Sequence, residues 1–467
     1  MTDSPAFRSP IDPAEQPILD KILDIRDSLS LLKQDRSTYV KSKDVITLYN
    51  ALINQVEKLN DIRTTKPEEQ NRVDTVLDDC FQLISLFFLT IGRNYEAPAV
   101  YSAISSAKRL LDHLREAGFY SLKDLEGISR YLGQWQASIE RDKDQHSPHL
   151  LKLLEARINV CRHTLQDLQE GVSKLEPTLA DTYEKLVSLL RSLSACNTRS
   201  KFPTKEVKDL EAQLLAIREE LHEETPDHQG KSAEEVYLEK IHAMNLADYE
   251  VPKEGPAVVS VLLARCLLWA EIIQRRQGKI DERFNDTYDK LVKIRNTLEQ
   301  MNLTHAWIDE SRVKGNFVDE QGNVADLHTN RTLLYLLRKS YSFVFIYIIS
   351  SEPVSEALLP IYNQLLTLKK CLVEVKRNGG VDSARELYPY SMKLHSIDNM
   401  KKDGAFRVGN DIPEGQGSVI ALLSECFDLA YELRNEAEER SEAEVPEERD
   451  EAQPVGTKTD HGLAAGI

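Results

Sequence analysis

Apolar residues recur along this chain with the period of an amphipathic α-helix. Between residues 19 and 29 they stand at offsets 0, 3, 4, 6 and 10, which places them on one face of a helix. Segments with this pattern, here called first segments, start at residues 19, 101, 183, 288 and 362. The recurrence predicts five copies of one helical element, of which the copy at residue 101 is the weakest match.

Two other segments recur at matching distances from the first segments. In four of the five copies a basic, acidic and apolar triplet follows 22 to 24 residues after the start, and we call it the second segment. A third, more apolar segment completes each copy. The third segments are residues 76–83, 153–160, 262–269, 336–343 and 422–429, of which 153–160 diverges most. This unbroken order predicts five tandem units of three helices.

The repeats divide the chain into predicted domains. These are a disordered N-terminal arm (1–16), five helical units (17–98, 99–180, 181–285, 286–358 and 359–435) and a disordered acidic tail (436–467), with an acidic insertion (222–256) in the third unit. We predict an all-α protein whose units stack as an extended helical array or a large bundle, with the third segments as its inner layer. The sequence leaves solenoid and closed bundle as alternatives.

The amino-acid composition supports long helices, and the net charge argues against nucleic acid as a partner. The 467 residues include only 19 Gly and 18 Pro, which disfavours a turn-rich β architecture. With 59 Lys and Arg against 76 Asp and Glu, the formal net charge of -17 makes nucleic acid an unlikely partner. Most of this charge lies in the acidic insertion and the tail, so the repeat body is nearly neutral.

Two stretches are apolar enough to raise the question of a membrane. Residues 257–273 contain Arg265, and residues 333–349 contain Arg338 and Lys339. Charges at such positions are costly in a bilayer, so we predict buried core helices and no transmembrane segment. The chain opens on a polar stretch without an apolar signal core, and we expect an intracellular protein.

A basic residue interrupts the apolar face of most first segments. Offset 7 falls inside the apolar arc, and it is occupied by Arg26, Lys108, Leu190, Arg295 and Lys369. A cation there must pair or bind something. One interpretation is an ion pair with the acid of the second segment, which is Asp44, Asp124 or Glu386. The other is that the cations hold an anionic ligand or partner.

Candidate chemistry is otherwise sparse. A small residue recurs in the middle of the third segments, as Cys80, Cys266, Ser340 and Cys426, and we predict that it packs in the core. The six cysteines are far apart and form no CxxC pair, so we predict no metal site and no cofactor. The sequence contains no nucleotide-binding, metalloprotease, hydrolase or kinase motif. We therefore assign no catalytic residue and predict that the protein is not an enzyme.

Residues 19–29, 76–83, 183–193 and 288–298 together resemble a fungal family of uncharacterised helical proteins that carry only domain-of-unknown-function labels. The similarity extends from about residue 17 to residue 434. The resemblance implies a fungal source and residence in the cytoplasm, with the nucleus as a second compartment. It brings no established activity and no catalytic residues.

Two hypotheses for function follow. The first is a non-enzymatic scaffold or adaptor that binds protein partners, which the sequence does not identify, through its helical repeats and acidic segments. The alternative is a helical bundle that binds an anionic small molecule, or a phosphorylated or lipid head group, through Arg26, Lys108, Arg295 or Lys369. The sequence decides neither the oligomeric state nor the identity of a partner.

Overall fold

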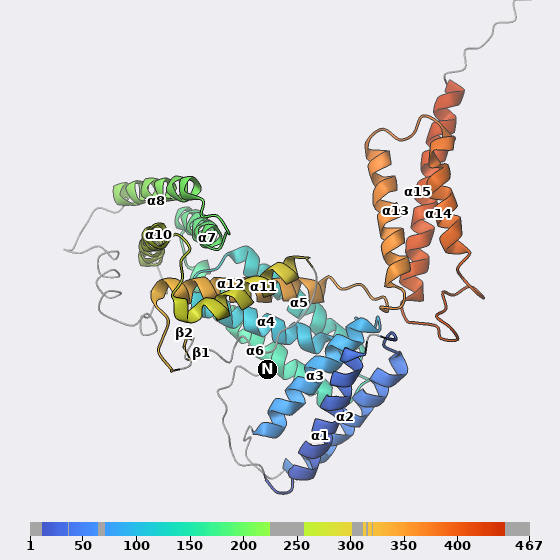
Figure 1. Ribbon diagram of the computed structural model, residues 1–467, viewed down its shortest axis with the longest axis horizontal. Coiled ribbons are helices and arrows are strands. Elements are labelled where there is room, and N and C mark those ends of the chain that lie inside the picture. The colour runs from blue at the N-terminus through green and yellow to red at the C-terminus, as the bar shows by residue number, and fades with distance from the viewer. Residues whose placement is uncertain are drawn as a thin grey trace, which may run out of the picture. The chain divides into compact units, whose positions relative to one another are not determined.

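The computed structural model describes residues 12–35, 37–63, 71–224, 256–300, 312–313, 316–319 and 321–443, and most of these residues are helical (Figure 1). The α-helices are α1 (Gln16–Gln34), α2 (Ser42–Arg63), α3 (Arg72–Thr90), α4 (Ala97–Ala117), α5 (Leu122–Arg141), α6 (Pro148–Ser173), α7 (Pro177–Asn197), α8 (Thr204–Glu224), α10 (Pro256–Arg276), α11 (Asn285–Gln300), α12 (Leu327–Ile349), α13 (Leu359–Arg377), α14 (Tyr388–Asp398) and α15 (Gln416–Ala443). Short 3₁₀ turns, η2 (Glu282–Phe284) and η4 (Ala384–Leu387), precede α11 and α14. The all-α prediction is confirmed.

The chain divides into two compact units. Helices α1 to α12 belong to the N-terminal unit, which ends at Glu356, and α13 to α15 belong to the C-terminal unit, which starts at Ala357. Where the sequence predicts the second helix of the fourth repeat, the described residues form a two-residue antiparallel ribbon, β1 (Arg312–Val313) and β2 (Asn316–Phe317). The four predicted repeats before residue 358 are thus not separate bodies.

Helix α4 lies at the centre of the N-terminal unit, where α3, α5, α6 and α12 pack around it (Figure 1). Among the described helices it buries the largest share of its residues. Small side chains such as Ala99, Ser102 and Ala103 are buried there and allow several helices to approach. Because α4 contains a first segment, the prediction that only third segments form the inner layer is wrong.

Contacts in the N-terminal unit reach beyond neighbouring repeats. The side chain of Phe345 in α12 meets the rings of Tyr131 and Trp135 in α5, with centroid distances of 5.9 and 6.3 Å. After α12 the backbone N–H of Glu356 donates to the carbonyl of Thr90 at 3.0 Å. The end of the fourth predicted repeat therefore packs on the first. An extended array, in which each repeat contacts only its neighbours, does not describe this unit.

Glycine at position 92 permits that closure. Gly92 has a φ of 83°, and a Cβ atom there would lie 2.7 Å from the backbone N of Ser355. Next to it, the side-chain amide of Asn94 donates to the carbonyl of Ser351 at 2.7 Å. A larger residue at position 92 would both strain the backbone and push residues 351–356 away from α3.

Helices α10 and α12 are long and apolar enough to cross a membrane by length and composition alone. In the structure, however, α10 packs on α7 and α8, and α12 packs on α4 and α11. Of their most apolar windows, 50% and 44% of the residues are buried inside the protein. Both are core helices of the N-terminal unit.

Two predicted boundaries are wrong because flanking residues pack against the helices. Glu15, assigned to a disordered arm, is buried and accepts hydrogen bonds from Arg63 Nε at 2.8 Å and Asn71 Nδ2 at 2.7 Å. Helix α15 continues past residue 436 to Ala443, with Ala437 buried and Arg440 Nη1 donating to the carbonyl of Gly379 at 2.9 Å. Residues 1–11 of the predicted arm, residues 444–467 of the predicted tail and most of the acidic insertion lie outside the described residues.

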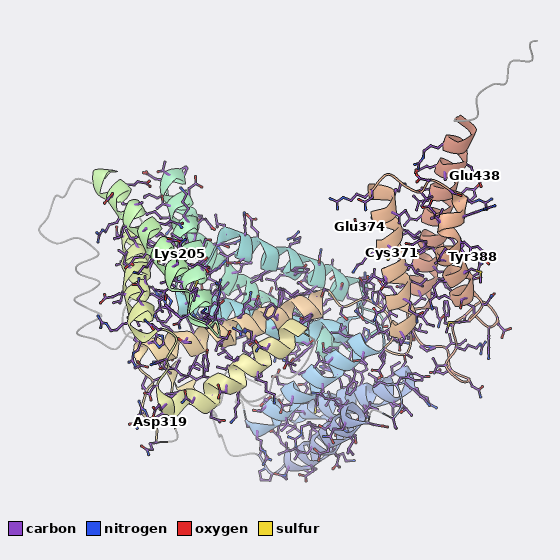
Figure 2. The ribbon with its side chains drawn as sticks, turned by 45° about the horizontal axis from the view of Figure 1, so that its top comes forward. Lys205, Asp319, Cys371, Glu374, Tyr388 and Glu438 are labelled. Atoms are coloured by element: carbon purple, nitrogen blue, oxygen red, sulfur yellow. The ribbon has the colours of Figure 1, made fainter. Side chains whose placement is uncertain are left out.

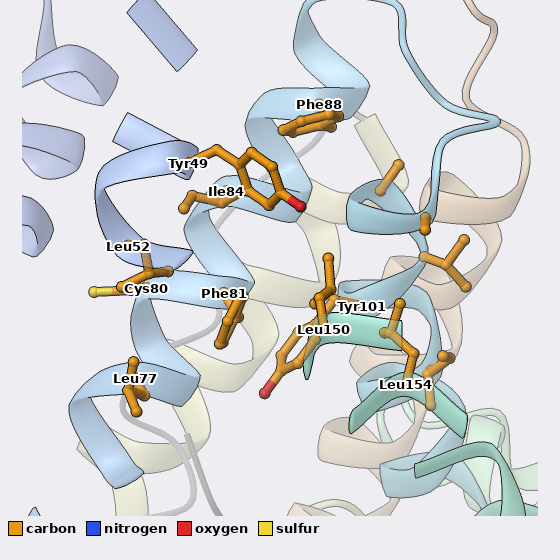
Figure 3. Close-up of a cluster of buried hydrophobic side chains, with 14 of the residues drawn as sticks. Tyr49, Leu52, Leu77, Cys80, Phe81, Ile84, Phe88, Tyr101, Leu150 and Leu154 are labelled. Carbon is orange, nitrogen blue, oxygen red and sulfur yellow. The ribbon is translucent and has the colours of Figure 1, made fainter. Parts of the chain in front are cut away.

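A buried ion pair joins three helices of the N-terminal unit. Asp78 of α3 accepts hydrogen bonds from Arg157 Nη2 of α6 at 2.6 Å and from the Tyr101 hydroxyl of α4 at 2.5 Å. The Arg157 guanidinium lies over the Tyr101 ring, and Phe81 stacks on that ring at 5.2 Å (Figure 3). Burial raises the pKa of Asp78, but the charge of Arg157 and the Tyr101 hydrogen bond outweigh it and hold the pKa below its usual value.

A second buried polar cluster joins α7, α10 and α12. Asn197 donates through Nδ2 to Thr332 Oγ1 at 2.8 Å, and its Oδ1 lies 3.1 Å from His328 Nε2. The His328 ring also lies 5.7 Å from the Trp269 ring. Burial, aided by the charge of Arg276 and opposed by that of Asp326, lowers the pKa of His328 from 6.5 to about 4. His328 is therefore neutral in the folded protein at neutral pH.

Replacing the buried carboxylate should destabilise the N-terminal unit. We expect Asp78→Asn to lower the free energy of unfolding by about 2 to 4 kcal/mol, because it leaves the Arg157 charge without its counterion. All three Trp residues precede Glu356, so Trp fluorescence during urea unfolding reports on this unit. The control Asp27→Asn, whose side chain is 68% exposed, should change the free energy by less than about 0.5 kcal/mol. Equal effects of the two variants would contradict this role.

Acidic conditions should destabilise the same unit through His328. Because its folded pKa of about 4 lies below its unfolded value of 6.5, the unfolded chain binds the extra proton between these values and stability falls as pH falls. Between about pH 7 and pH 5 the loss should be on the order of 2 kcal/mol. In His328→Gln, Trp-detected unfolding should depend less steeply on pH, whereas the exposed control His395→Gln should behave as the wild type. Identical slopes in all three proteins would contradict the assignment.

Candidate interaction surface

The acids of the second segments do not receive the first-segment cations. Asp124 caps its own helix, since it accepts from the Ser121 N–H at 3.0 Å while Ser121 Oγ accepts from the Asp124 N–H at 3.2 Å. It also pairs with Arg191 of α7, which together with the capping bonds lowers its pKa against the effect of burial. At Asp124, therefore, the acid of the second segment caps its own helix. The predicted ion pair between Lys108 and Asp124 is wrong.

The four cations instead have four different sets of partners. Lys108 pairs with Asp112 on its own helix at 2.6 Å, and Arg26 lies 3.4 Å from the Asp27 carboxylate. Arg295 donates to Asn296 Oδ1 at 2.8 Å. Lys369 pairs with Glu425 of α15 at 2.6 Å. The contacts do not bring these side chains together as one anion site.

Four of the six thiols occupy equivalent places between a first segment and a third segment. Each donates to the carbonyl of the residue three positions into the first segment. These pairs are Cys80 with Ile22, Cys161 with Ile104, Cys266 with Leu186 and Cys426 with Leu365, at 3.7, 3.9, 3.7 and 3.5 Å. In the sequence, the divergent segment 153–160 places Arg157 at the position of the recurring cysteines. In the structure this position belongs to Cys161, four residues later. That alignment was therefore wrong by one helical turn.

These thiols are poor candidates for chemistry. Cys80, Cys161, Cys266 and Cys426 are buried. Burial raises the pKa of Cys80 and Cys266 to about 12 and that of Cys161 to about 11, which suppresses the reactive thiolate. Across the part of the chain that the structure describes, no three His, Cys, Asp or Glu side chains gather as a metal-binding group.

The C-terminal unit is built on α15, which α13 and α14 flank (Figure 1). Two ion pairs seven residues apart join α13 to α15, because Lys376 pairs with Glu432 at 2.7 Å one heptad after the pair of Lys369 with Glu425. On the other side His395 of α14 meets the ring of Phe427 at 5.2 Å. Within this unit of three α-helices, several large apolar side chains remain exposed.

Exposed apolar side chains are concentrated in this unit. Of the fourteen large hydrophobic residues exposed in the described chain, eight lie after Ala357. Tyr388 of α14 is 65% exposed (Figure 2). Met392, one turn later on α14, is 53% exposed, and Tyr431 of α15, one turn after Phe427, is 65% exposed. We call Tyr388, Met392, His395, Phe427 and Tyr431 the α14–α15 surface, because the contact of His395 with Phe427 connects its two stripes.

The sequence reasoning missed this surface. The available signal was that Tyr388 and Met392 fall outside the stripe of Leu387, Leu394 and Ile397, which are buried against α15. A second candidate surface is a shallow groove between α1 and α2, which Leu31, Leu32 and Leu48 line together with Asp35 and Asp44. Aromatic and methionine side chains are enriched in protein interfaces, which makes the α14–α15 surface the stronger candidate.

Comparisons with known proteins identify the family but provide no fold. The family model "Protein of unknown function (DUF2408)" matches residues 172–308 and 351–454. A CUB1 family protein of Schizosaccharomyces pombe is 34% identical over 460 residues, which cover 93% of this chain and 96% of that protein. No solved structure is significantly similar to this chain.

A second relative comes from another fungus. The protein named Cu(2+) suppressing and bleomycin sensitive protein 1 of Saccharomyces cerevisiae is 34% identical over 504 residues, which cover 92% of this chain and 91% of that protein. Both relatives match nearly end to end, so the similarity includes both compact units. The chain therefore belongs to this fungal family of proteins of unknown function, as the resemblance of its repeated segments predicted.

Proposed function

We propose that this protein is a non-enzymatic intracellular scaffold, acting in the cytoplasm and nucleus, whose C-terminal unit binds protein partners. The observation that carries the proposal is the α14–α15 surface, where Tyr388, Met392 and Tyr431 are more than half exposed. Tyr388 and Met392 lie one turn apart on α14, and a group of large apolar side chains exposed on one surface is typical of an interaction site. Tyrosine supplies a large, rigid contact area, and methionine adapts its shape to a partner.

The N-terminal unit suits the role of a rigid base. Its helices are joined by the Asp78 and His328 clusters, and residues 351–356 close onto α3. Its first-segment cations Arg26 and Lys108 pair with carboxylates, and Arg295 bonds to an amide oxygen. These pairings favour a scaffold over the alternative of a binder of anionic small molecules.

The name of the yeast relative suggests the process in which the scaffold acts. That protein is named for Cu(2+) suppression and bleomycin sensitivity. We propose that this chain takes part in the same cellular response by bringing partner proteins together. The thiols of Cys80, Cys161, Cys266 and Cys426 are buried and hydrogen-bonded to carbonyls, and Cys371 is exposed. In the described part of the chain no three His, Cys, Asp or Glu side chains gather as a metal-binding group, which does not favour direct binding of copper there.

Removing the exposed side chains should abolish partner binding without unfolding the protein. We expect the triple variant Tyr388→Ser, Met392→Ser and Tyr431→Ser to lose a defined set of co-purifying proteins, each by at least about tenfold, because interface energy is concentrated in such anchors. Affinity purification from native fungal lysate with quantitative mass spectrometry measures this loss. Growth on bleomycin of a strain that depends on the variant is a second readout.

A matched control changes exposed apolar residues elsewhere. Tyr95→Ser, Val160→Ser and Val324→Ser alter side chains of the N-terminal unit that are at least half exposed, and should leave the co-purifying set unchanged. Circular dichroism should give equal helix content for both triple variants and the wild type. The proposal fails if the wild type retains no specific partner, or if both triple variants lose the same proteins.

A further inference from the structure

Helix α13 has two parallel stripes of the same composition, one residue apart in sequence. The first stripe is Leu365 and Leu372 with Lys369 and Lys376, together with the N-cap residue Leu358. The second is Leu359, Leu366 and Val373 with Lys370 and Arg377. In each, apolar residues recur every seven positions, and a basic residue follows the second and third of them by four. Because each residue advances about 100° around a helix, the second stripe repeats the first on an adjacent face.

The first stripe is occupied by α15. Leu358, Leu365 and Leu372 are fully buried. Lys369 and Lys376 pair with Glu425 and Glu432 at 2.6 and 2.7 Å. The occupying helix therefore offers two glutamates seven residues apart, with Cys426 and Leu429 between them. Its Cys426 thiol lies 3.5 Å from the Leu365 carbonyl, which shows how closely the two helices approach.

The second stripe carries the same side chains without a cover. Leu359 and Val373 are 37% and 42% exposed, and Leu366 is half-buried. Lys370 is exposed and makes no ion pair with the described residues. Arg377 is 78% exposed and lies 3.7 Å from Glu374 on its own helix, a contact that solvent weakens. Figure 2 shows Glu374 on the side of α13 away from α15.

We propose that the second stripe of α13 is the docking site for an acidic amphipathic helix of a partner protein, with two carboxylates seven residues apart and apolar residues between them. This specifies a partner class for the C-terminal unit and rests on the proposed docking function of that unit. Lys370 and Arg377 receive the two carboxylates, while Leu359, Leu366 and Val373 receive the apolar face. The geometry is that by which the first stripe binds α15.

The spacing favours a helix over a lipid surface. An anionic membrane attracts any cluster of Lys and Arg and requires no particular register. Here both basic residues keep the heptad spacing of the pairs with Glu425 and Glu432, and the apolar residues keep the heptad of the buried leucines. Heptad spacing on adjacent stripes is typical of a helix that packs against two neighbours.

The test uses the full-length chain and a synthetic peptide of residues 419–439, which carries the α15 stripe. The protein's own α15 stays in place, because its effective concentration exceeds that of an added peptide. We expect the peptide to bind, and Lys370→Glu with Arg377→Glu to weaken it by at least about tenfold in fluorescence anisotropy, because both attractions become repulsions. The matched control, Lys393→Glu with Lys402→Glu, reverses two other exposed lysines of the unit and should leave binding unchanged.

A charge swap makes the test specific. A peptide with Glu425→Lys and Glu432→Lys should bind the Lys370→Glu, Arg377→Glu protein more tightly than the wild type. Binding that is insensitive to the protein variant, or absence of this reversal, would overturn the proposal. So would a Lys370- and Arg377-dependent dimer in sedimentation, which would identify a second copy as the occupant. Binding to phosphatidylserine vesicles in place of the peptide would assign a lipid surface instead.

The two proposals fail separately. If the peptide does not bind but the co-purified proteins still require Tyr388, Met392 and Tyr431, only the second stripe is excluded. If the peptide binds as expected while the lysate yields no specific partner, the stripe is a helix-binding site and the scaffold function lacks support. Circular dichroism of Lys370→Glu, Arg377→Glu confirms that lost binding does not reflect lost folding.

Discussion

Close packing between a first segment and a third segment is the constraint on which both units depend. In four of the five repeats a cysteine thiol meets a carbonyl three residues into the first segment, at distances of 3.5 to 3.9 Å. Only a small side chain fits so near another helix backbone. In the fourth repeat Ser340 occupies the position, but its hydroxyl bonds to the Leu336 carbonyl of its own helix at 2.9 Å. Size, rather than reactivity, accounts for the recurrence of these residues.

Once the helix pairs form, polar groups at their junctions decide how the pairs assemble. Asp78, Tyr101 and Arg157 come from α3, α4 and α6 and bind one another within a mainly apolar core. Between α7 and α12, the Nε2 of His328 lies 3.1 Å from the Oδ1 of Asn197. Such groups are stable in the interior only with their partners in place, so an arrangement that separates these helices would leave buried polar atoms unsatisfied. This favours the observed closed unit over an open array.

The sequence was sufficient to predict which face of a helix is apolar and buried. It was not sufficient to predict the register of a segment or the choice between several possible partners of a side chain. Helical periodicity located the first and third segments, and their apolar character predicted that Cys80, Cys266 and Cys426 would be buried. Segment 153–160 was misaligned because a shift of one turn preserves an apolar stripe, so Arg157 and Cys161 were interchangeable in the pattern. The partner of Lys108 was wrong because a flexible side chain on a helix reaches its own i+4 residue as easily as a neighbouring helix.

The pair of helices that carry a first and a third segment is covered by more neighbouring helices in the N-terminal unit than in the C-terminal unit. This difference bears on the proposed function. In the N-terminal unit the pair of α4 and α6 is covered by α3, α5 and α12, and nearly every apolar position of α4 is buried. In the C-terminal unit the equivalent pair of α13 and α15 has α14 as its third helix, and α13 buries only Leu365 and Leu372 within its length. Leu366 and Val373 nevertheless lie on the adjacent stripe, where polar residues would make the protein more soluble. These apolar residues support the proposed interface, and the heptad spacing of Lys370 and Arg377 beside them supports an acidic helix as its proposed partner.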